Sequence, residues 1–403
     1  MSSIMFLGRF CIVAVLALAA IGLPNASHAV TFRVLHKFRG YPKDGAGPRG
    51  SLVMDASGNL YGTTYYGGVG ADIGTIFMIA PDGTESVVHS FGYGDAAGAP
   101  SAGLTPDTQG NFFGTDVGGT NSCGEVFEYT PGKGEQVLYV FSGAPNDGCM
   151  PTGTLLIDND GTIYGTTQEG GLHNVGTVFK LSKEKETIVH SFVAKRSDGW
   201  QPIAGLIMDQ SGNLYGTTRS GGGYNECDGA QGCGTIYKIA PDGTESILFR
   251  FGDGERGATP FAGLFLDAAG NLVGTTVNGG AYTCANSYGC GTVFQLTPDG
   301  KETVLHAFTG KRDGDSPFGT LIADGAGNLF GTTAYGGRRS CGCGTVFGIS
   351  SDGSFATLFT FRNSKLEGAN SLAGLYEDSS GNLYGTTYDG GRNNYGVVFE
   401  ISP

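Results

Sequence analysis

The stretch that decides the fold is Gly58-Asn59-Leu60-Tyr61-Gly62-Thr63-Thr64. It recurs six more times with small changes, and an internal repeat of this period indicates a repeat architecture. The further copies begin at Gly110, Gly161, Gly212, Gly270, Gly327 and Gly381.

Two other landmarks keep the same order around every copy. An element of the form G-T-[VI]-F follows each copy and begins at Gly74, Gly124, Gly176, Gly234, Gly291, Gly344 and Gly396. An opening residue precedes each copy, at Pro48, Pro100, Pro151, Pro202, Pro260, Pro317 and Ser371. The chain therefore contains seven equivalent units.

The sequence pattern of each unit predicts four short strands, which we name A to D, with turn residues between them. In the fifth unit the predicted strands are Ala262–Leu266, Leu272–Thr276, Gly291–Leu296 and Glu302–Phe308. Strand A is expected to line a central channel, where convergence favours small residues such as Gly103, Gly205, Gly263 and Gly374. Four-stranded units repeated around an axis are typical of a β-propeller. The predicted fold is an all-β, seven-bladed propeller of antiparallel blades.

The two ends of the chain predict how the ring closes. The seventh unit stops after its third strand, which begins at Val397, and the missing outer strand is present at residues 31–38. That segment, Phe32-Arg33-Val34-Leu35-His36-Lys37-Phe38, matches strand D of the fifth unit, and closing the ring with it leaves no free sheet edge. Residues 30–403 are thus expected to form one propeller domain.

Residues 1–29 resemble a cleaved export signal. Arg9 precedes an apolar run from Phe10 to Leu23, Pro24 ends it, and Ser27-His28-Ala29 supplies the small residues of a cleavage site. The apolar run is short for a membrane span, and no other segment is apolar enough to cross a bilayer. We expect a secreted or periplasmic protein.

The composition supports a folded protein and narrows its partners. The 403 residues include 73 Gly, 18 Tyr and 25 Phe, which suits many short strands joined by tight turns. The formal net charge of −13 disfavours nucleic acid and anionic lipid surfaces. Neutral or cationic ligands are compatible with this charge. The protein is expected to be a monomer.

Eight cysteines follow the signal segment, an even number that suits disulfides in an exported protein. Cys227 with Cys233 and Cys284 with Cys290 would close B–C loops, and Cys149 can reach Cys123 on the same face. Cys341 and Cys343 can pair only through a very short ring, so this bond is left open. The cysteines lie in separate blades, and no metal site is predicted from them.

Repeated polar positions have structural interpretations. His36, His89, His190 and His306 occupy one strand D position where other blades carry aromatic residues, which indicates packing. An Asp opens every A–B turn and is expected to cap backbone N–H groups. Acids of the D–A loops are interpreted either as a calcium-binding ring or, preferably, as solvated turn residues; they are Asp44, Asp95, Asp147, Asp198, Asp253, Asp313 and Glu367. No cofactor other than this possible calcium is expected.

Candidate ligand-binding residues lie where the repeat is broken, on the face that carries the B–C and D–A loops. These positions mix aromatic rings, acids and arginines, which suits a sugar or peptide ligand. They are Tyr65, Tyr66, Glu169, Trp200, Arg219, Tyr224, Tyr335, Tyr388, Asp389 and Arg392, with Arg338 and Arg339 nearby in sequence. No catalytic residues are predicted, because no nucleophile motif, phosphate loop or isolated carboxylate pair is present.

The motif G-N-L-Y-G-T-T, G-G and G-T-V-F, followed by P-D-G and V-L-H-x-F, resembles the GloVer-type tandem repeats of bacterial exported proteins. The resemblance covers the chain after the signal segment and implies a secreted, repeat-built protein without assigned catalytic residues.

Three functions are compatible with the sequence. The preferred hypothesis is a binding module for a glycan or peptide. The alternatives are an extracytoplasmic polysaccharide hydrolase or lyase using Glu169, Asp389 and Arg219, and a scaffold for other exported proteins. Fold alone does not separate them.

Overall fold

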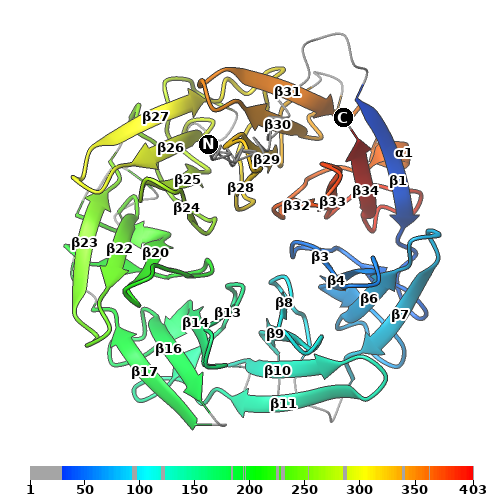
Figure 1. The fold of residues 1–403 in the computed structure, drawn as a ribbon, viewed down its shortest axis with the longest axis horizontal. Coiled ribbons are helices and arrows are strands. Elements are labelled where there is room, and N and C mark those ends of the chain that lie inside the picture. Colours follow the sequence, from blue (N-terminus) through cyan, green and yellow to red (C-terminus); the bar gives the residue numbers. More distant parts are fainter. Residues whose placement is uncertain are drawn as a thin grey trace, which may run out of the picture.

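A computed structural model shows seven four-stranded antiparallel sheets arranged around a central axis (Figure 1). The structure describes residues 30–92, 98–118, 123–182, 185–193, 195, 197–223, 227, 232–252, 254–284, 288–337, 341–362 and 364–402. The predicted seven-bladed propeller is confirmed.

The strands follow one another from the channel outwards in every blade. Blade 1 consists of β3 (Val53–Met54), β4 (Leu60–Thr64), β6 (Thr75–Ile79) and β7 (Glu85–Ser90). Blade 2 consists of β8 (Thr105–Pro106), β9 (Phe112–Asp116), β10 (Glu125–Thr130) and β11 (Gly134–Val140). Blade 3 consists of β13 (Leu156–Ile157), β14 (Ile163–Thr167), β16 (Thr177–Ser182) and β17 (Lys185–Ser191). Blade 4 consists of β19 (Ile207–Met208), β20 (Leu214–Thr218), β22 (Thr235–Ile239) and β23 (Glu245–Arg250). Blade 5 consists of β24 (Phe265–Leu266), β25 (Leu272–Thr276), β26 (Thr292–Leu296) and β27 (Glu302–Ala307). Blade 6 consists of β28 (Ile322–Ala323), β29 (Leu329–Thr333), β30 (Thr345–Ile349) and β31 (Phe355–Thr360).

Blade 7 closes the ring as predicted. It consists of β32 (Tyr376–Glu377), β33 (Leu383–Thr387), β34 (Val397–Ser402) and, outermost, the N-terminal strand β1 (Thr31–Lys37). β1 pairs antiparallel with β34 from Thr31 opposite Ser402 to Lys37 opposite Val397. Figure 1 shows the blue β1 beside the red β34, so both ends of the described chain belong to one blade.

The innermost strands are shorter than predicted. In blade 5 the strand contains only Phe265 and Leu266, whereas the sequence suggested five residues from Ala262. The preceding residues instead run past the next blade at the channel, where the space is narrow. A Cβ at Gly50 would lie 2.4 Å from the backbone nitrogen of Gly103, so only glycine permits this approach. Gly103, Gly205, Gly263 and Gly374 line the channel as predicted.

One glycine of the repeated motif makes room for a large ring in the same blade. A Cβ at Gly62 would lie 2.5 Å from the ring of Phe77, and the equivalent glycines face the equivalent rings at similar distances. The rings are fully buried and are Phe77, Phe127, Phe179, Tyr237, Phe294, Phe347 and Phe399. The glycine of the motif, on strand B, therefore leaves the space that the large ring on strand C fills.

Neighbouring blades are joined by a ring of aromatic contacts. A buried phenylalanine just after each outer strand meets the strand C ring of the next blade edge-on, with centroids 5.0–5.4 Å apart. The pairs are Phe38–Phe77, Phe91–Phe127, Phe141–Phe179, Phe192–Tyr237, Phe251–Phe294, Phe308–Phe347 and Phe361–Phe399. Such contacts make each blade depend on both neighbours.

Tyr237 is the one strand C tyrosine in this circle of contacts, where the other blades have phenylalanine, and its hydroxyl leads to a stability prediction. Its side chain is fully buried and its hydroxyl has no hydrogen-bond partner among the described residues. Because an unsatisfied buried hydroxyl costs about 1–3 kcal/mol, Tyr237→Phe is expected to stabilise the protein by about 1 kcal/mol. Urea unfolding measures this change. A variant less stable than the parent would show that the hydroxyl has a favourable contact, and Tyr384→Phe, which removes a hydroxyl bonded to Asp378, is the matched control.

The A–B turns confirm the capping role of the repeated aspartates. Asp55 Oδ1 accepts hydrogen bonds from the backbone nitrogens of Ser57 and Asn59 at 2.8 and 2.9 Å, and Oδ2 accepts one from Asn59 Nδ2. The same arrangement recurs at Asp107, Asp209, Asp267, Asp324 and Asp378.

Candidate functional site

The B–C and D–A loops lie side by side on one face, as predicted. Three small two-stranded ladders join them: β2 (Gly45–Ala46) with β5 (Tyr66–Gly67), β12 (Gly148–Cys149) with β15 (Glu169–Gly170), and β18 (Gly199–Trp200) with β21 (Ser220–Gly221). Isolated bridges take their place in blades 5 to 7, and the short helix α1 (Ser364–Glu367) lies in the loop before blade 7. We call this surface the loop face.

Disulfides brace the loop face. The structure pairs Cys123 with Cys149, Cys227 with Cys233, Cys284 with Cys290, and Cys341 with Cys343. The first three pairings match the prediction, and the fourth, left open by the sequence, is formed as well. Disulfides of this number are consistent with an exported protein. The expected export signal, residues 1–29, lies outside the described residues.

The first hollow on this face lies where the ends of the chain meet, between blade 7 and blade 1. We call it the seam hollow. Its volume is about 310 Å³, and its lining includes Tyr41, Tyr66, Tyr388 and Tyr395 together with Asp72, Asp389 and Asn394. Tyr41, Tyr66 and Tyr395 are 53, 42 and 43 % exposed, so aromatic surface faces solvent here.

An arginine orders the inner tyrosines of the seam hollow. The Arg49 guanidinium lies 4.1 Å from the ring centroid of Tyr65 and 4.9 Å from that of Tyr388, and Arg49 Nη2 donates to the Tyr388 hydroxyl at 3.3 Å. Tyr65 in turn meets Tyr66 edge-on at 4.7 Å. These cation–π and aromatic contacts hold the rings in place before any ligand arrives.

Glycines allow the rings of Tyr388 and Tyr395 to lie close to the backbone. A Cβ at Gly47 would lie 2.9 Å from the Tyr388 ring, and one at Gly40 would lie 2.7 Å from the Tyr395 ring. Burial raises the pKa of Tyr66, and the neighbouring Tyr388 raises it further, so the phenol stays neutral at physiological pH. A neutral phenol can both donate and accept hydrogen bonds.

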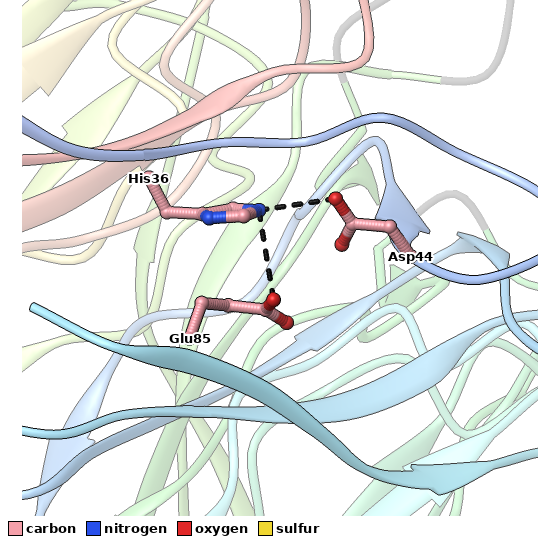
Figure 2. Close-up of side chains that lie close together, drawn as sticks. All are labelled: His36, Asp44 and Glu85. Carbon is pink, nitrogen blue, oxygen red and sulfur yellow. Dashed lines mark hydrogen bonds and ion pairs between the residues drawn. The ribbon is translucent and has the colours of Figure 1, made fainter.

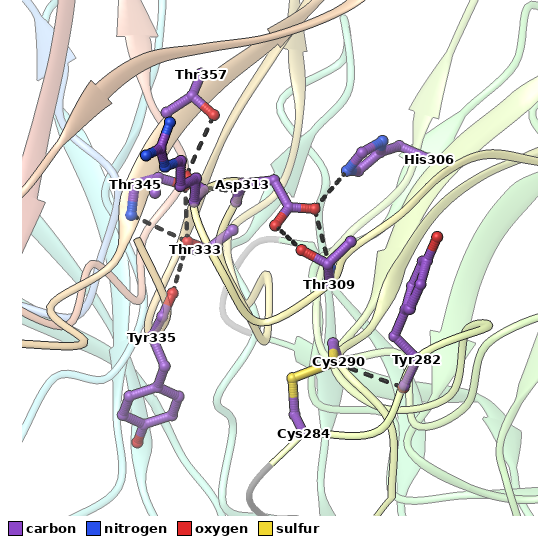
Figure 3. A network of polar contacts seen from close by, with 11 residues as sticks. Tyr282, Cys284, Cys290, His306, Thr309, Asp313, Thr333, Tyr335, Thr345 and Thr357 are labelled. Atoms are coloured by element: carbon purple, nitrogen blue, oxygen red, sulfur yellow. Dashed lines mark hydrogen bonds and ion pairs between the residues drawn. A yellow bond between two sulfur atoms is a disulfide. The ribbon is translucent and has the colours of Figure 1, made fainter. Parts of the chain in front are cut away.

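A second hollow lies on the loop face over blades 4 to 6. Its volume is about 500 Å³, and its lining includes Arg219, Phe261, Phe318, Tyr282 and Tyr335. Arg219 lies 5.1 Å from the Phe261 ring centroid, and Phe261 meets Phe318 edge-on at 5.1 Å. Figure 3 shows Tyr282 next to the Cys284–Cys290 disulfide and Tyr335 bonded through its carbonyl to Thr333.

The predicted ligand-binding residues divide between these two hollows. Tyr66, Tyr388 and Asp389 line the seam hollow with Tyr65 behind them, whereas Arg219 and Tyr335 line the second hollow. Glu169 lines neither of them. Glu169, Asp389 and Arg219, the residues of the hydrolase alternative, therefore do not share either of these two hollows.

The other predicted residues have different surroundings. Trp200 Nε1 donates to the carbonyls of Val193 and Lys195 at 3.2 Å, which ties the ring to its own loop. Arg392 is exposed and lines neither hollow. Tyr224, Arg338 and Arg339 lie outside the described residues.

Sequence reasoning missed Arg49, Tyr41 and Tyr395. Arg49 follows an opening proline, a position held in the other units by Ser101, Thr152, Ile203, Phe261, Phe318 and Leu372. This departure from the repeat was a usable signal. Tyr41 and Tyr395 lie 354 positions apart, and only ring closure brings them to one hollow.

The preferred interpretation of the D–A acids as solvated turn residues is wrong for three of them. Asp44, Asp147 and Asp198 are 5, 5 and 7 % exposed. Asp44 accepts hydrogen bonds from the backbone nitrogens of Arg39 and Gly45, because the loop folds around its carboxylate. Asp147 and Asp198 do the same in their loops.

The strand D histidines pack against rings as predicted, but packing is not their whole role. His36 and His306 each lie edge-on to the phenylalanine two residues later, at 4.9 and 4.8 Å. His36 Nε2 also lies 3.1 Å from Asp44 Oδ2, and His306 Nε2 lies 3.2 Å from Asp313 Oδ2. The histidines thus link the outer strand to the following loop.

Comparison with known proteins identifies relatives of the whole repeat array. The family model described as the Gloeobacter/Verrucomicrobia repeat matches residues 25–228, 88–283 and 223–403. A search of curated proteins finds no match.

Among solved structures, the extracellular domain of a protein assigned to the hybrid two-component systems of B. thetaiotaomicron is similar, with a TM-score of 0.57, 12 % identity, and coverage of 91 % of this chain and 39 % of that chain. A structure of an extracellular domain assigned to a one-component system of the same organism gives a TM-score of 0.55 at 13 % identity, covering 92 % of this chain and 40 % of that one. The chain thus spans about two fifths of these proteins, and the likeness concerns the fold. No helix in the described part of the chain has the length and apolarity needed to cross a membrane.

Proposed function

Because the chain belongs to the Gloeobacter/Verrucomicrobia repeat family and folds as a seven-bladed propeller, we propose that it is an exported binding module that recognises a neutral glycan in the seam hollow. The observation that carries this proposal is the gathering of four tyrosines, Tyr41, Tyr66, Tyr388 and Tyr395, around one hollow on the loop face.

The chemistry of the hollow suits a sugar. A pyranose ring has an apolar C–H face that can stack on an aromatic ring, and its rim of hydroxyls needs donors and acceptors. The exposed tyrosine rings offer the stacking surface, and their hydroxyls, with Asp389 and Asn394, offer hydrogen bonds. Arg49 contacts the rings of Tyr65 and Tyr388. Tyr388 still lines the hollow beside the exposed rings of Tyr41, Tyr66 and Tyr395, and these four residues form the surface available to a ligand.

The proposal predicts that Tyr66→Ala and Tyr388→Ala each weaken glycan binding at least tenfold, which corresponds to about 1.4 kcal/mol. Isothermal titration of purified protein with neutral oligosaccharides, selected first on a glycan array, measures this. Repeating the titration with EGTA or added calcium tests whether binding depends on calcium.

Tyr335→Ala is the matched control, because Tyr335 also follows strand B and is 46 % exposed but lines the second hollow. Loss of binding in Tyr335→Ala with unchanged binding in Tyr66→Ala would reject the seam hollow. A folded protein that binds no glycan and retains a peptide or protein partner would reject the glycan proposal.

A further inference from the structure

At two junctions between blades, a histidine, an aspartate and a glutamate from three separate segments converge. The histidine lies on an outer strand, the aspartate in the loop that follows, and the glutamate at the start of the next blade's outer strand. The two sets are His36–Asp44–Glu85 and His190–Asp198–Glu245, and in each the three possible ligand atoms lie within 4.8 Å of one another.

In the first set, the imidazole reaches both carboxylates. His36 Nε2 lies 3.1 Å from Asp44 Oδ2 and 4.0 Å from Glu85 Oε2, and Figure 2 shows the ring nitrogen pointing between the two acids. The three side chains are 13, 8 and 16 % exposed. Glu85 Oε1 is buried without a hydrogen-bond partner among the described residues. The nearby Arg39 is exposed.

The second set repeats this arrangement at a junction on the other side of the ring. His190 Nε2 lies 3.5 Å from Glu245 Oε2, yet His190 Nε2 and Glu245 Oε1 are both buried without a hydrogen-bond partner among the described residues. Asp198 is fixed by the backbone nitrogens of Val193 and Gly199 at 2.8 and 2.7 Å. The guanidinium of Arg250 donates to the carbonyl of Ser197.

A buried carboxylate oxygen or imidazole nitrogen without a hydrogen-bond partner destabilises the folded protein. Two carboxylates close together in a desolvated place repel each other, and a cation between them removes that cost. One imidazole nitrogen with two carboxylates is a ligand set that suits Zn²⁺, and the mixed nitrogen and oxygen donors also accept Mn²⁺. The remaining positions would be held by water.

A third junction shows what happens when the glutamate is missing. His306 lies 3.2 Å from Asp313, but Phe355 takes the place of the glutamate and stacks on the imidazole with centroids 3.7 Å apart. Thr309 Oγ1 donates to the other oxygen of Asp313, so protein groups satisfy this carboxylate (Figure 3). Glu186 Oε1 and Glu302 Oε1, at two other junctions, are also buried without a hydrogen-bond partner among the described residues, but Tyr139 and Phe249 stand there in place of the histidine. Within the described residues, all three ligand types come together at two junctions.

We propose that His36–Asp44–Glu85 and His190–Asp198–Glu245 each bind one divalent transition-metal cation that links the outer strands of consecutive blades. Each cation would join a strand, the following loop and the next blade. None of these six residues lines the seam hollow, although Asp44 lies in the loop that carries Tyr41. The proposal does not depend on glycan binding.

The test uses tag-free protein stripped with EDTA and then dialysed. Titration with ZnCl₂ is expected to show two saturable sites per chain and a concentration-dependent rise in Tm, because a cation that binds only the folded state stabilises it. Glu85→Gln and Glu245→Gln are each expected to reduce the stoichiometry from two to one, and the double variant to none. His306→Gln is the matched control and is expected to keep two sites.

Three results would overturn the proposal: no saturable binding of Zn²⁺ or Mn²⁺, an unchanged stoichiometry in the folded double variant, or loss of a site in His306→Gln. Because glutamine has the shape of glutamate, the variants are expected to fold. Circular dichroism of each variant checks this independently of metal binding.

Discussion

Phe38→Ala is expected to lower the free energy of unfolding by about 3–5 kcal/mol, the usual cost of removing a fully buried aromatic ring. Phe38 is 0 % exposed and meets Phe77 of blade 1 with centroids 5.0 Å apart. It follows β1, the strand that completes blade 7. The same ring therefore belongs to the contact between the last blade and the first.

Urea unfolding of Phe38→Ala and of Phe141→Ala provides the comparison. Phe141 makes the equivalent contact with Phe179 at 5.1 Å, within a continuous part of the chain. Both variants should be destabilised to a similar extent, but only Phe38→Ala should lose hydrogen-exchange protection first in β1 and β34. A near-neutral Phe38→Ala variant would contradict ring closure by the N-terminal strand.

The double substitution of Asp116 and Glu125 by threonine is expected to stabilise the protein by roughly 2–4 kcal/mol at pH 7, because it removes two unpaired buried carboxyl groups. Five blades carry a buried threonine pair here, hydrogen-bonded at 2.7–2.9 Å; the pairs are Thr64–Thr75, Thr167–Thr177, Thr218–Thr235, Thr276–Thr292 and Thr333–Thr345. Blade 2 has Asp116 opposite Glu125 instead, 2 and 1 % exposed, with three oxygens that lack hydrogen-bond partners among the described residues.

This pair also predicts a pH dependence. Burial raises the pKa of Asp116 from 3.8 to about 9, with Glu125 and Glu135 adding to the shift. Because the folded-state pKa exceeds that of the unfolded chain, the favourable contribution of the protonated carboxyl is complete below about pH 4 and is lost as the pH rises to about 9.

The stability gain from the double substitution should therefore grow between pH 5 and pH 9. Chemical denaturation of parent and variant across this range measures the difference, and Asp116→Asn serves as the control that removes the titration alone. Parallel stability profiles for parent and double variant would show that the pair does not titrate in this way.

The repeat was sufficient to predict the blades, because each blade is a local unit. The seven copies of G-N-L-Y-G-T-T located strand B, and in blade 5 the predicted Leu272–Thr276 agrees with the structure residue for residue. The Asp-capped turns and the closing strand were predictable for the same reason, since turn chemistry and strand pattern depend on near neighbours in sequence. Three of the four disulfides followed from their shared position in the repeat.

The contacts between blades could not be predicted in this way. Tyr41, Tyr66 and Tyr395 come from both ends of the chain, and the glutamate of each His–Asp–Glu set comes from the next repeat. The burial of Asp44, Asp147 and Asp198 depends on how each loop folds around its own carboxylate, which the acidic character of the residues does not reveal. Sequence alone determined the repeating unit and its number, because hydrogen bonding within a blade is local. Only the tertiary structure decided which side chains meet at the junctions, because closing the ring sets those distances.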